Sequence, residues 1–165
     1  MASENRIIKL ISNDGVEFEI QRNAIKRAVT IETLIIDLEL DDAEGQEQSI
    51  PLPLVNSDTL RRVVEFCRHH AEDPIFTENE EEFNRMMSDW DRNFLDIDRT
   101  ALYHLMLAAN YLDIKCLLKA ISRTIAEMVK GKSAIEMRRI LNLVNDFTPE
   151  EEEQVRKENA WCEVP

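Results

Sequence analysis

The sequence predicts an α+β protein in which a small sheet near the N-terminus precedes a longer helical part. Three observations indicate this class: two alternating runs flank an Asp-Gly turn, later segments repeat apolar residues at helical spacing, and the last third carries only helical signals. The chain has 165 residues, 44% of them hydrophobic, with only 3 glycines. It can therefore build a packed core as one domain, or as one small domain with an appendage.

The first element is expected to be a β-hairpin. The runs RIIKLI (6–11) and VEFEI (16–20) flank residues 13–15, Asn-Asp-Gly. Asp-Gly supplies the positive φ angles that a tight hairpin turn needs. In the second run, apolar residues alternate with glutamates, so one face of the hairpin is expected to be buried and the other to be wet.

A helix and a third strand are expected next. Apolar residues in 31–38 fall at helical spacing, and Thr30 is the expected N-cap. An acidic loop follows at 41–48. The run 49–55 is a short strand whose two prolines suit an edge position, because proline cannot donate to a ladder.

Two further helices are expected in the middle of the chain. The first begins near Ser57 and has an inward apolar stripe that includes Cys67. The acidic stretch 72–91 is expected to be a loop or an insertion, although it carries several large apolar side chains. The second helix is capped by Asp98, and because it is apolar on several faces we expect it to be the central buried helix.

The C-terminal third is expected to form three short helices. Asp113 caps a helix that Gly131 ends. Capping boxes at 133–136 and 148–151 open the next two, and the second box has proline at the first helical position. The glutamates of 150–153 lie in the first turn of the last helix, where the dipole favours negative charge. This acidic run therefore has a structural purpose.

Composition excludes several classes of function. The 33 acidic residues outnumber 20 basic ones, giving a net charge of −13, which argues against nucleic acid and against an anionic membrane surface. No apolar run approaches the roughly 20 residues that span a bilayer, and the N-terminus lacks the core of a signal peptide. The 3 cysteines include no CxxC pair, which favours a reducing compartment. We expect a soluble protein of the cytoplasm and nucleus.

Catalytic and metal motifs find little support. Residues 131–133 look like the end of a phosphate-binding loop, but the upstream glycine is an alanine inside a helix, so a helix stop and start fits better. Residues 91–102 resemble a calcium loop only in acidic spacing. One could also imagine a metal site, and a metal hydrolase built on it, at Cys67, His69 and His70. The simpler interpretation, which we favour, is an inward-facing thiol and two histidines at a helix C-terminus. We expect no enzyme, cofactor or metal.

The C-terminal helices carry a large amount of apolar side chain for their length. A buried Leu or Ile contributes about 1.5–3 kcal/mol, so leaving several in water forgoes much of a domain's stability. Two interpretations stay open: the helices complete an ordinary intramolecular core, or they form a groove for a partner helix. Trp161, at the end of an otherwise polar acidic helix, raises the same question.

Several motifs resemble the S-phase-kinase-associated (Skp-type) adaptor family of SCF ubiquitin ligases. They are IKLISNDGVEFEI, WDRNFLDID, LAANYLDIKCLL (107–118) and MVKGKSAIEMRRILNLVNDFTPEEEEQVRKENAWCE (128–163), and the likeness covers nearly the whole chain. It implies a BTB/POZ domain over 1–112 and a C-terminal helical extension over 113–165. The departures lie in loops: 41–48 is short, and 72–91 lacks the family's usual proline-rich stretch. We expect both loops to be mobile.

The resemblance implies a non-catalytic adaptor that bridges a cullin scaffold to F-box substrate receptors. Asn110 and Tyr111, in the AANYLD motif, are the expected cullin-facing residues. The F-box is expected to pack on the C-terminal helices, which resolves the question of the surplus apolar surface. The residues expected to contact the F-box are Leu118, Ile121, Ile125, Val129, Ile140, Leu143, Phe147, Asn159, Trp161 and Cys162.

A second interpretation stays open beside the adaptor. BTB domains commonly dimerise, and a spare hydrophobic face favours self-association. The chain would then be a structural module, a homodimer or part of a larger intracellular assembly, independent of ubiquitin ligation.

Overall fold

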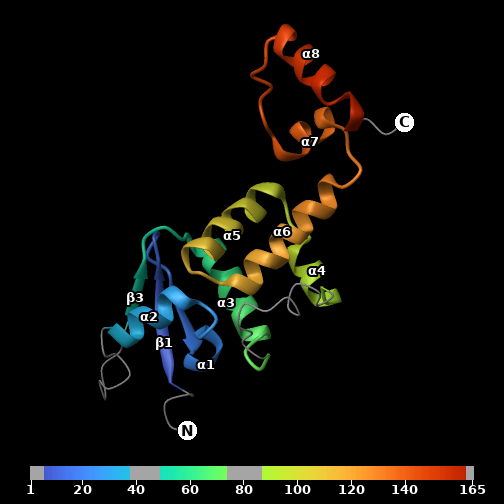
Figure 1. Ribbon diagram of the computed structural model, residues 1–165. Coiled ribbons are helices and arrows are strands. Elements are labelled where there is room, and N and C mark those ends of the chain that lie inside the picture. The colour runs from blue at the N-terminus through green and yellow to red at the C-terminus, as the bar shows by residue number, and fades with distance from the viewer. Residues whose placement is uncertain (1–5, 38–48, 74–86, 163–165) are drawn as a thin grey trace. The chain divides into compact units, whose positions relative to one another are not determined.

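The structure is a computed structural model that describes residues 6–37, 49–73 and 87–162 (Figure 1). The elements in chain order are β1 (Ile7–Ser12), β2 (Glu17–Gln21), α1 (Arg22–Ile25), α2 (Val29–Asp37), β3 (Ser49–Leu52), α3 (Ser57–His69), α4 (Asp89–Leu95), α5 (Arg99–Tyr111), α6 (Lys115–Val129), α7 (Ala134–Leu141), α8 (Pro149–Glu158) and the 3₁₀ turn η1 (Ala160–Cys162). The predicted α+β class is confirmed.

The chain divides into two compact units, Met1–Thr124 and Ile125–Pro165, and the division falls inside α6. The first unit holds the sheet and all the fully buried side chains among the described residues. The second holds the end of α6, then α7, α8 and η1. The boundary predicted between residues 112 and 113 is of another kind, because it divides the expected cullin-binding region from the expected F-box-binding region. That division stays a prediction.

The sheet has the strand order β2-β1-β3. β1 pairs antiparallel with β2, placing Ile8 opposite Ile20, and parallel with β3. Ile8, Leu10 and Ile20 are buried on the helix-covered face. β3 lies at the edge, as its prolines predicted, because its outer side needs no ladder donors.

The hairpin turn differs in detail from the prediction. Within the turn only Gly15 has a positive φ, at 78°. The Ser12 N–H donates to the Val16 carbonyl at 3.0 Å, so the loop has three residues and Gly15 occupies its left-handed position. Asp14 instead anchors the turn, because its carboxylate accepts a hydrogen bond from the Ser57 N–H at 2.9 Å.

The predicted N-cap at Thr30 is wrong. α2 begins at Val29, and Thr30 lies in its first turn. Its hydroxyl donates to the Tyr111 carbonyl at 2.9 Å, and its N–H to the Leu112 carbonyl at 3.3 Å. A tertiary contact with a residue 81 positions away therefore uses the oxygen that the sequence assigned to local capping. This contact ties the start of α2 to the end of α5.

A salt bridge joins α1 to α2. The Arg22 guanidinium makes a two-pronged contact with the Glu32 carboxylate, and its Nη2 donates to Oε1 at 2.7 Å. The Arg22 side chain is only 6% exposed and that of Glu32 28%. A planar guanidinium matches a carboxylate in this way, so the pair fixes the angle between two short helices.

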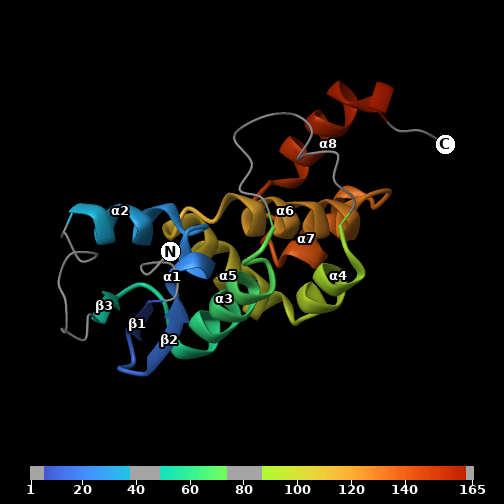
Figure 2. The same ribbon diagram turned by 90° about the horizontal axis from the view of Figure 1, so that it is seen from below.

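α3 and α5 form the centre of the first unit and lie side by side in both ribbon views (Figures 1 and 2). α3 begins at Ser57 as predicted, with Asn56 as its N-cap, and α5 is capped by Asp98 as predicted. α5 is central as expected, but it is not buried all round. Leu105 is fully buried, whereas Tyr103 and Leu107 are 54% and 47% exposed.

α4 corrects the prediction of a loop over 72–91. Residues 74–86 lie outside the described part, as do 41–48, but residues 89–91 belong to a helix. Ser88 accepts a hydrogen bond from the Asp91 N–H at 3.1 Å, and the Asp91 carboxylate accepts one from the Ser88 N–H at 3.2 Å. This capping box starts α4, and the acidic residues that suggested a loop favour its first turn.

Asp113 does not cap α6. It has a φ of 51° and follows α5. Its N–H donates to the Asn110 carbonyl at 3.2 Å, and the Ile114 N–H to the Ala109 carbonyl at 2.8 Å. This pair of bonds is a Schellman motif, so Asp113 ends α5 in the left-handed position that glycine usually fills.

The later helix boundaries agree with prediction. Gly131 follows α6 with a φ of 70°. Ser133 and Thr148 are the N-caps of α7 and α8, each in a complete capping box, and proline opens α8. In the described part of the chain, no helix combines the length and the apolar character that crossing a membrane requires.

Candidate protein-binding surfaces

The C-terminal unit has helices but no core of its own. No side chain described within residues 125–161 is buried, and α7 and α8 contribute none. Large apolar side chains lie open instead: Leu143 is 59% exposed, Phe147 44% and Trp161 82%. A helix whose apolar side chains find no cover within its own unit is incomplete by itself, because tertiary packing is the main source of helix stability.

Local hydrogen bonds hold these helices in shape. Hydrogen bonds from the Ser133 backbone and side chain lower the pKa of Glu136, and those from Thr148 lower the pKa of Glu151 in the same way. Asn142, with a φ of 53°, ends α7 in the left-handed position. The unit is therefore preformed by its caps rather than by burial.

Arg138 connects α7 to the segments that follow it. Its Nη1 donates to the Glu152 carboxylate on α8 at 3.1 Å. Its guanidinium carbon also lies 5.5 Å from the centre of the Phe147 ring. This cation–π contact orients an aromatic ring that nevertheless stays 44% exposed.

The predicted F-box residues on α6 lie along one helix. Leu118, Ile125 and Val129 are half-buried, whereas Ile121 is completely buried. Ile121 therefore supports the helix from beneath in this conformation, and the other three residues are the ones open to contact.

The remaining predicted F-box residues belong to the C-terminal unit. Ile140 is half-buried on α7, and Leu143 and Phe147 are exposed in the segment after it. Asn159 ends α8 and its side-chain amide donates to the Val155 carbonyl at 2.8 Å. Trp161 and Cys162 lie in η1, and the Trp161 ring projects into solvent.

The predicted cullin-facing residues lie at the end of α5. Asn110 is exposed and Tyr111 half-buried. Because Thr30 binds the Tyr111 carbonyl, the start of α2 lies beside them. α2 adds two exposed apolar side chains, Val29 at 45% and Ile36 at 60%, which sequence reasoning did not assign. They are two helical turns apart, on one face of the helix.

Tyr103 and Leu107 were also missed. They are four residues apart on α5, so they share one face of that helix, and both are exposed. Their apolar character suggested burial, and nothing in the sequence distinguishes an inward from an outward apolar residue in a helix that is apolar on several sides. The exposed pair adds an apolar patch to the first unit.

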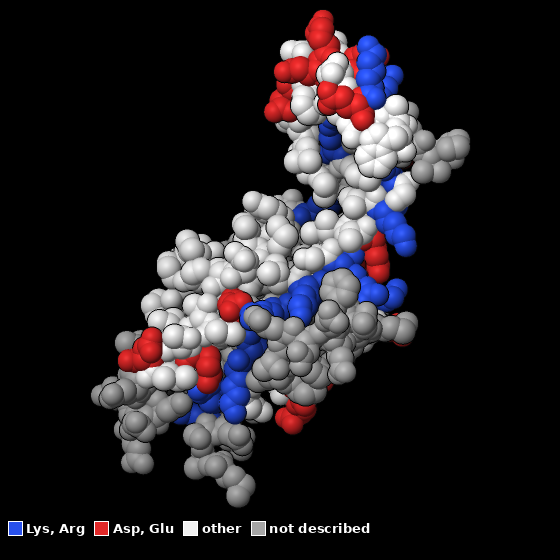
Figure 3. All heavy atoms as spheres, viewed as in Figure 1, with Lys and Arg blue, Asp and Glu red and all other residues white. Residues whose placement is uncertain are grey.

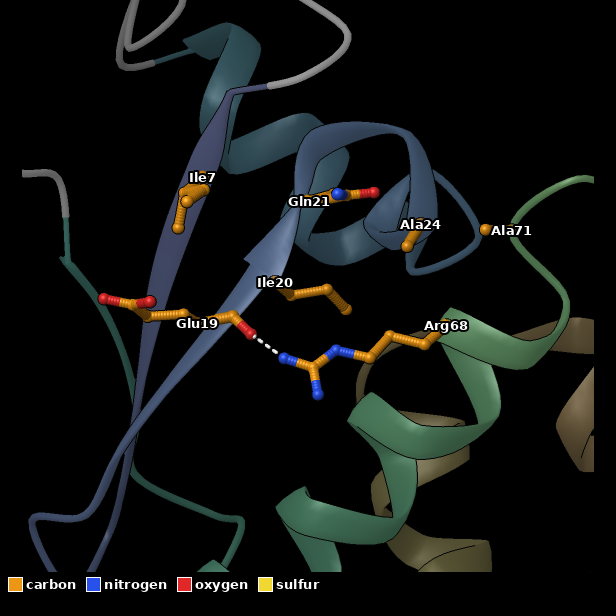
Figure 4. Close-up of a pocket in the computed structure, with 7 residues that line it drawn as sticks. All are labelled: Ile7, Glu19, Ile20, Gln21, Ala24, Arg68 and Ala71. Carbon is orange, nitrogen blue, oxygen red and sulfur yellow. Dashed lines mark hydrogen bonds between the residues drawn. The ribbon is translucent and has the colours of Figure 1, made fainter.

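A pocket of about 360 Å³ lies beside β2, at the end of α3 (Figure 4). The Arg68 guanidinium crosses it and donates to the Glu19 carbonyl on the outer edge of β2. Its lining residues are Ile7, Glu19, Ile20, Gln21, Ala24, Arg68 and Ala71. The polar groups of this pocket are one carboxylate, one amide and one guanidinium, and the rest of its lining is aliphatic. This set contains no nucleophile and no acid–base pair.

The cysteine and histidines considered as metal ligands have other environments. Burial raises the pKa of the Cys67 thiol to about 12, so it remains protonated. His69 stacks on Trp90 with ring centres 3.7 Å apart. Among the described residues, no three His, Cys, Asp or Glu side chains are grouped so that they could hold a metal ion.

Charge is unevenly distributed over the surface. Figure 3 shows a band of Lys and Arg along α6, although the whole chain carries a net charge of −13. Lys115, Lys119 and Arg123 are exposed on this helix at intervals of four residues. Each already takes part in an interaction within the protein.

A small sheet covered by helices, with a helical extension that leaves its apolar side chains open, defines a POZ-type α+β protein. Sequence comparison agrees: the profile described as "Skp1 family, tetramerisation domain" matches residues 6–72, and the one described as "Skp1 family, dimerisation domain" matches residues 115–162. The chain belongs to the Skp1 family.

Relatives match along nearly the whole length. A "Skp1-related protein" of Caenorhabditis elegans is 49% identical over 166 residues, covering 98% of this chain and 94% of the relative. Proteins of Arthroderma otae and Arthroderma benhamiae, each named "E3 ubiquitin ligase complex SCF subunit sconC", are 42% identical over 160 residues, covering 94% of both chains. The predicted family is confirmed.

Proposed function

We propose that this protein is the adaptor subunit of an SCF-type ubiquitin ligase, which joins a cullin scaffold to F-box substrate receptors. The family membership and the names of the fungal relatives support this role. The structural observation that carries it is the C-terminal unit, whose helices are capped but bury no described side chain. Such a unit is suited to receive a partner helix.

The residues proposed to contact the F-box are open apolar side chains, some in the C-terminal unit and some on α6. Exposed Leu143, Phe147 and Trp161 supply apolar area that a partner can bury. Aromatic residues of this kind are frequent hot spots at interfaces. Ile121 acts as support beneath α6, because it is already fully buried. Asn159 and Cys162 belong to the segment that carries Trp161.

The cullin surface is formed by the end of α5 and by α2. Asn110 and Tyr111 supply polar and aromatic groups, and exposed Val29 and Ile36 supply apolar area beside them. The hydrogen bond from Thr30 to the Tyr111 carbonyl makes these two elements one continuous support. The two proposed surfaces use different residues, so one chain can hold both partners.

The adaptor acts by binding and not by catalysis, in the cytoplasm and the nucleus. The pocket beside β2 offers no catalytic arrangement, and Cys67 is held as a thiol, which is not the nucleophilic form. The adaptor brings the substrate receptor and the scaffold together, which raises the local concentration of a substrate near the rest of the ligase.

Reconstitution of the three proteins tests this role. We expect the full chain, an F-box domain and the N-terminal part of a cullin to form a 1:1:1 complex by light scattering, while the latter two do not associate without the adaptor. Tyr111→Ala should weaken cullin binding and leave F-box binding unchanged. Absence of a ternary complex, with each binary mixture also negative, would refute the adaptor function.

Self-association is the second candidate function, because both family descriptions name oligomerisation. The exposed apolar side chains of the C-terminal unit are also suited to a second copy. Sedimentation of the chain at tens of micromolar distinguishes the two roles. A stable dimer that persists when the F-box domain is added favours a structural module, whereas a dimer that the F-box domain dissociates favours the adaptor.

A further inference from the structure

His70 lies between two carboxylates at the junction of α3 and α4. Its Nδ1 is 2.8 Å from an Asp73 oxygen, and its Nε2 is 3.0 Å from an Asp91 oxygen. The side chains of His70 and Asp91 are only 13% and 15% exposed, and that of Asp73 30%. Both ring nitrogens are therefore engaged at a site that water reaches poorly.

The chemistry of the three groups determines which form of the ring fits. An ionised carboxylate can only accept hydrogen bonds, and neutral imidazole carries a single N–H. A neutral ring therefore donates to one carboxylate and turns its lone pair toward the other. The imidazolium donates to both, and each of these bonds is charge-assisted. The geometry around His70 is complete only when the ring carries a proton on both nitrogens.

The surroundings keep the ring in place. The Arg27 Nε donates to the His70 carbonyl at 2.8 Å, and its Nη2 donates to the Asp73 carbonyl. The ring centre of Phe66 lies 4.3 Å from that of His70. The rings of His69 and Trp90 meet its edge, with centres at 4.9 and 5.5 Å. The charged or titratable groups around His70 are thus Asp73, Asp91, Arg27 and His69.

Asp91 connects the histidine to the start of α4. One of its carboxylate oxygens contacts His70, and the other accepts hydrogen bonds from the N–H and the hydroxyl of Ser88 in the capping box. The carboxylate that caps α4 is therefore also the one that binds the end of α3. Trp90, between Asp91 and the cap, stacks on His69 and on Phe94, so α4 is held by this one cluster.

We propose that His70 is a proton-operated latch that holds the start of α4 against the end of α3. With the ring protonated, Asp73 and Asp91 are both bonded and α4 is fixed. With the ring neutral, one bond is lost and a lone pair faces a carboxylate, so α4 opens more often. The latch is closed while the ring is protonated on both nitrogens and loosens when the ring becomes neutral. It stands independently of the proposed adaptor function.

Nuclear magnetic resonance of the full chain tests the latch. The ¹⁵N shifts of the two ring nitrogens distinguish the imidazolium from either neutral tautomer. We expect His70 to be doubly protonated at low pH, and the α4 amides and the Trp90 indole N–H to shift with its titration. Above that titration, the hydrogen-exchange protection of α4, corrected for intrinsic rates, should fall by about tenfold, the value of one charge-assisted bond.

Variants separate the latch from general effects of pH. The chain has only 3 histidines, and His104→Gln, on α5, is the matched control that should retain the transition. His70→Gln should abolish it and leave α4 in its loosened state at every pH. Asp73→Asn is the second latch variant, because it leaves the capping box intact, and it should move the transition to lower pH.

Three results would overturn the proposal. One is a His70 ring that is a neutral tautomer at the lowest pH at which the protein is folded. The second is a titration of His70 that leaves the α4 amide shifts and protection unchanged. The third is a transition that survives in folded Asp73→Asn at the same pH. If His70→Gln does not fold, the ring shifts of the unmodified protein and the Asp73→Asn result still decide.

Discussion

Truncation of Trp161 to alanine separates the free state of the C-terminal unit from its bound state. The ring is 82% exposed, so it contributes little packing to the free protein. We expect Trp161→Ala to change the free energy of unfolding by less than about 0.5 kcal/mol, as for a surface substitution. The same change should weaken binding of an F-box domain strongly, because the ring then has a partner to lose.

The size of the binding effect follows from the exposed area. A tryptophan with 82% of its surface open can remove on the order of 200 Å² from water, or about 5 kcal/mol at 25 cal/mol per Å². Ordering of the ring and of its short segment offsets about 3 kcal/mol of this. The remaining ~2 kcal/mol corresponds to roughly a 30-fold increase in Kd.

Isothermal titration calorimetry of the full chain with an F-box domain measures this. Ile7→Ala is the matched control, since Ile7 is also exposed, at 58%, but lies on β1 in the other unit. It should leave the affinity unchanged, and Trp161→Ala should leave cullin binding unchanged. An affinity loss below about twofold, or an equal loss in the Ile7 variant, would refute the reasoning that assigns Trp161 to the F-box surface.

Three other predictions concern stability. Glu32→Gln removes the charge facing the buried Arg22. Because Glu32 is partly exposed, we expect the free energy of unfolding, measured by urea denaturation, to fall by about 1–2 kcal/mol. No loss would show that other partners of Arg22 compensate. Asp113→Gly relieves a φ of 51° and should stabilise the protein by about 0.5–1 kcal/mol in thermal unfolding, whereas destabilisation would contradict the strain. The pKa of Glu136 and that of Glu151 are lowered in the folded state, so the ionised caps stabilise α7 and α8 at pH values above the ordinary pKa of 4.5. This stabilisation is lost as the pH falls and the two carboxylates take up protons. Circular dichroism should therefore show helix loss on acidification, and an unchanged signal would count against the caps.

Local signals were the ones that the sequence predicted well. The caps at Ser133 and Thr148 and the stop at Gly131 depend on residues within four positions of each other, and all three are confirmed. Thr30 failed because its hydroxyl binds a carbonyl 81 residues away, and no local pattern contains that partner. α4 was missed although Ser88 and Asp91 have the spacing of a capping box, because the acidic composition around them suggested a loop.

The candidate site was predicted unevenly for a related reason. Sequence patterns identify which side chains are apolar, but not which of them the fold leaves uncovered. Ile121 was expected at the surface and is buried, whereas Tyr103 and Leu107 belong to the helix expected to be buried and are exposed. The direct contacts of Asn110 and Trp161 with partner proteins stay predictions.

The preformed but uncovered helices of the C-terminal unit have a consequence for how receptors share the adaptor. Their shape is set by caps and not by a bound partner, so every receptor meets the same preformed apolar surface, which includes Phe147 and Trp161. Under the proposed function, receptors then compete for one site by mass action. Which substrates are marked depends on the concentration and affinity of each receptor, and a newly abundant receptor displaces the others without any change in the adaptor itself.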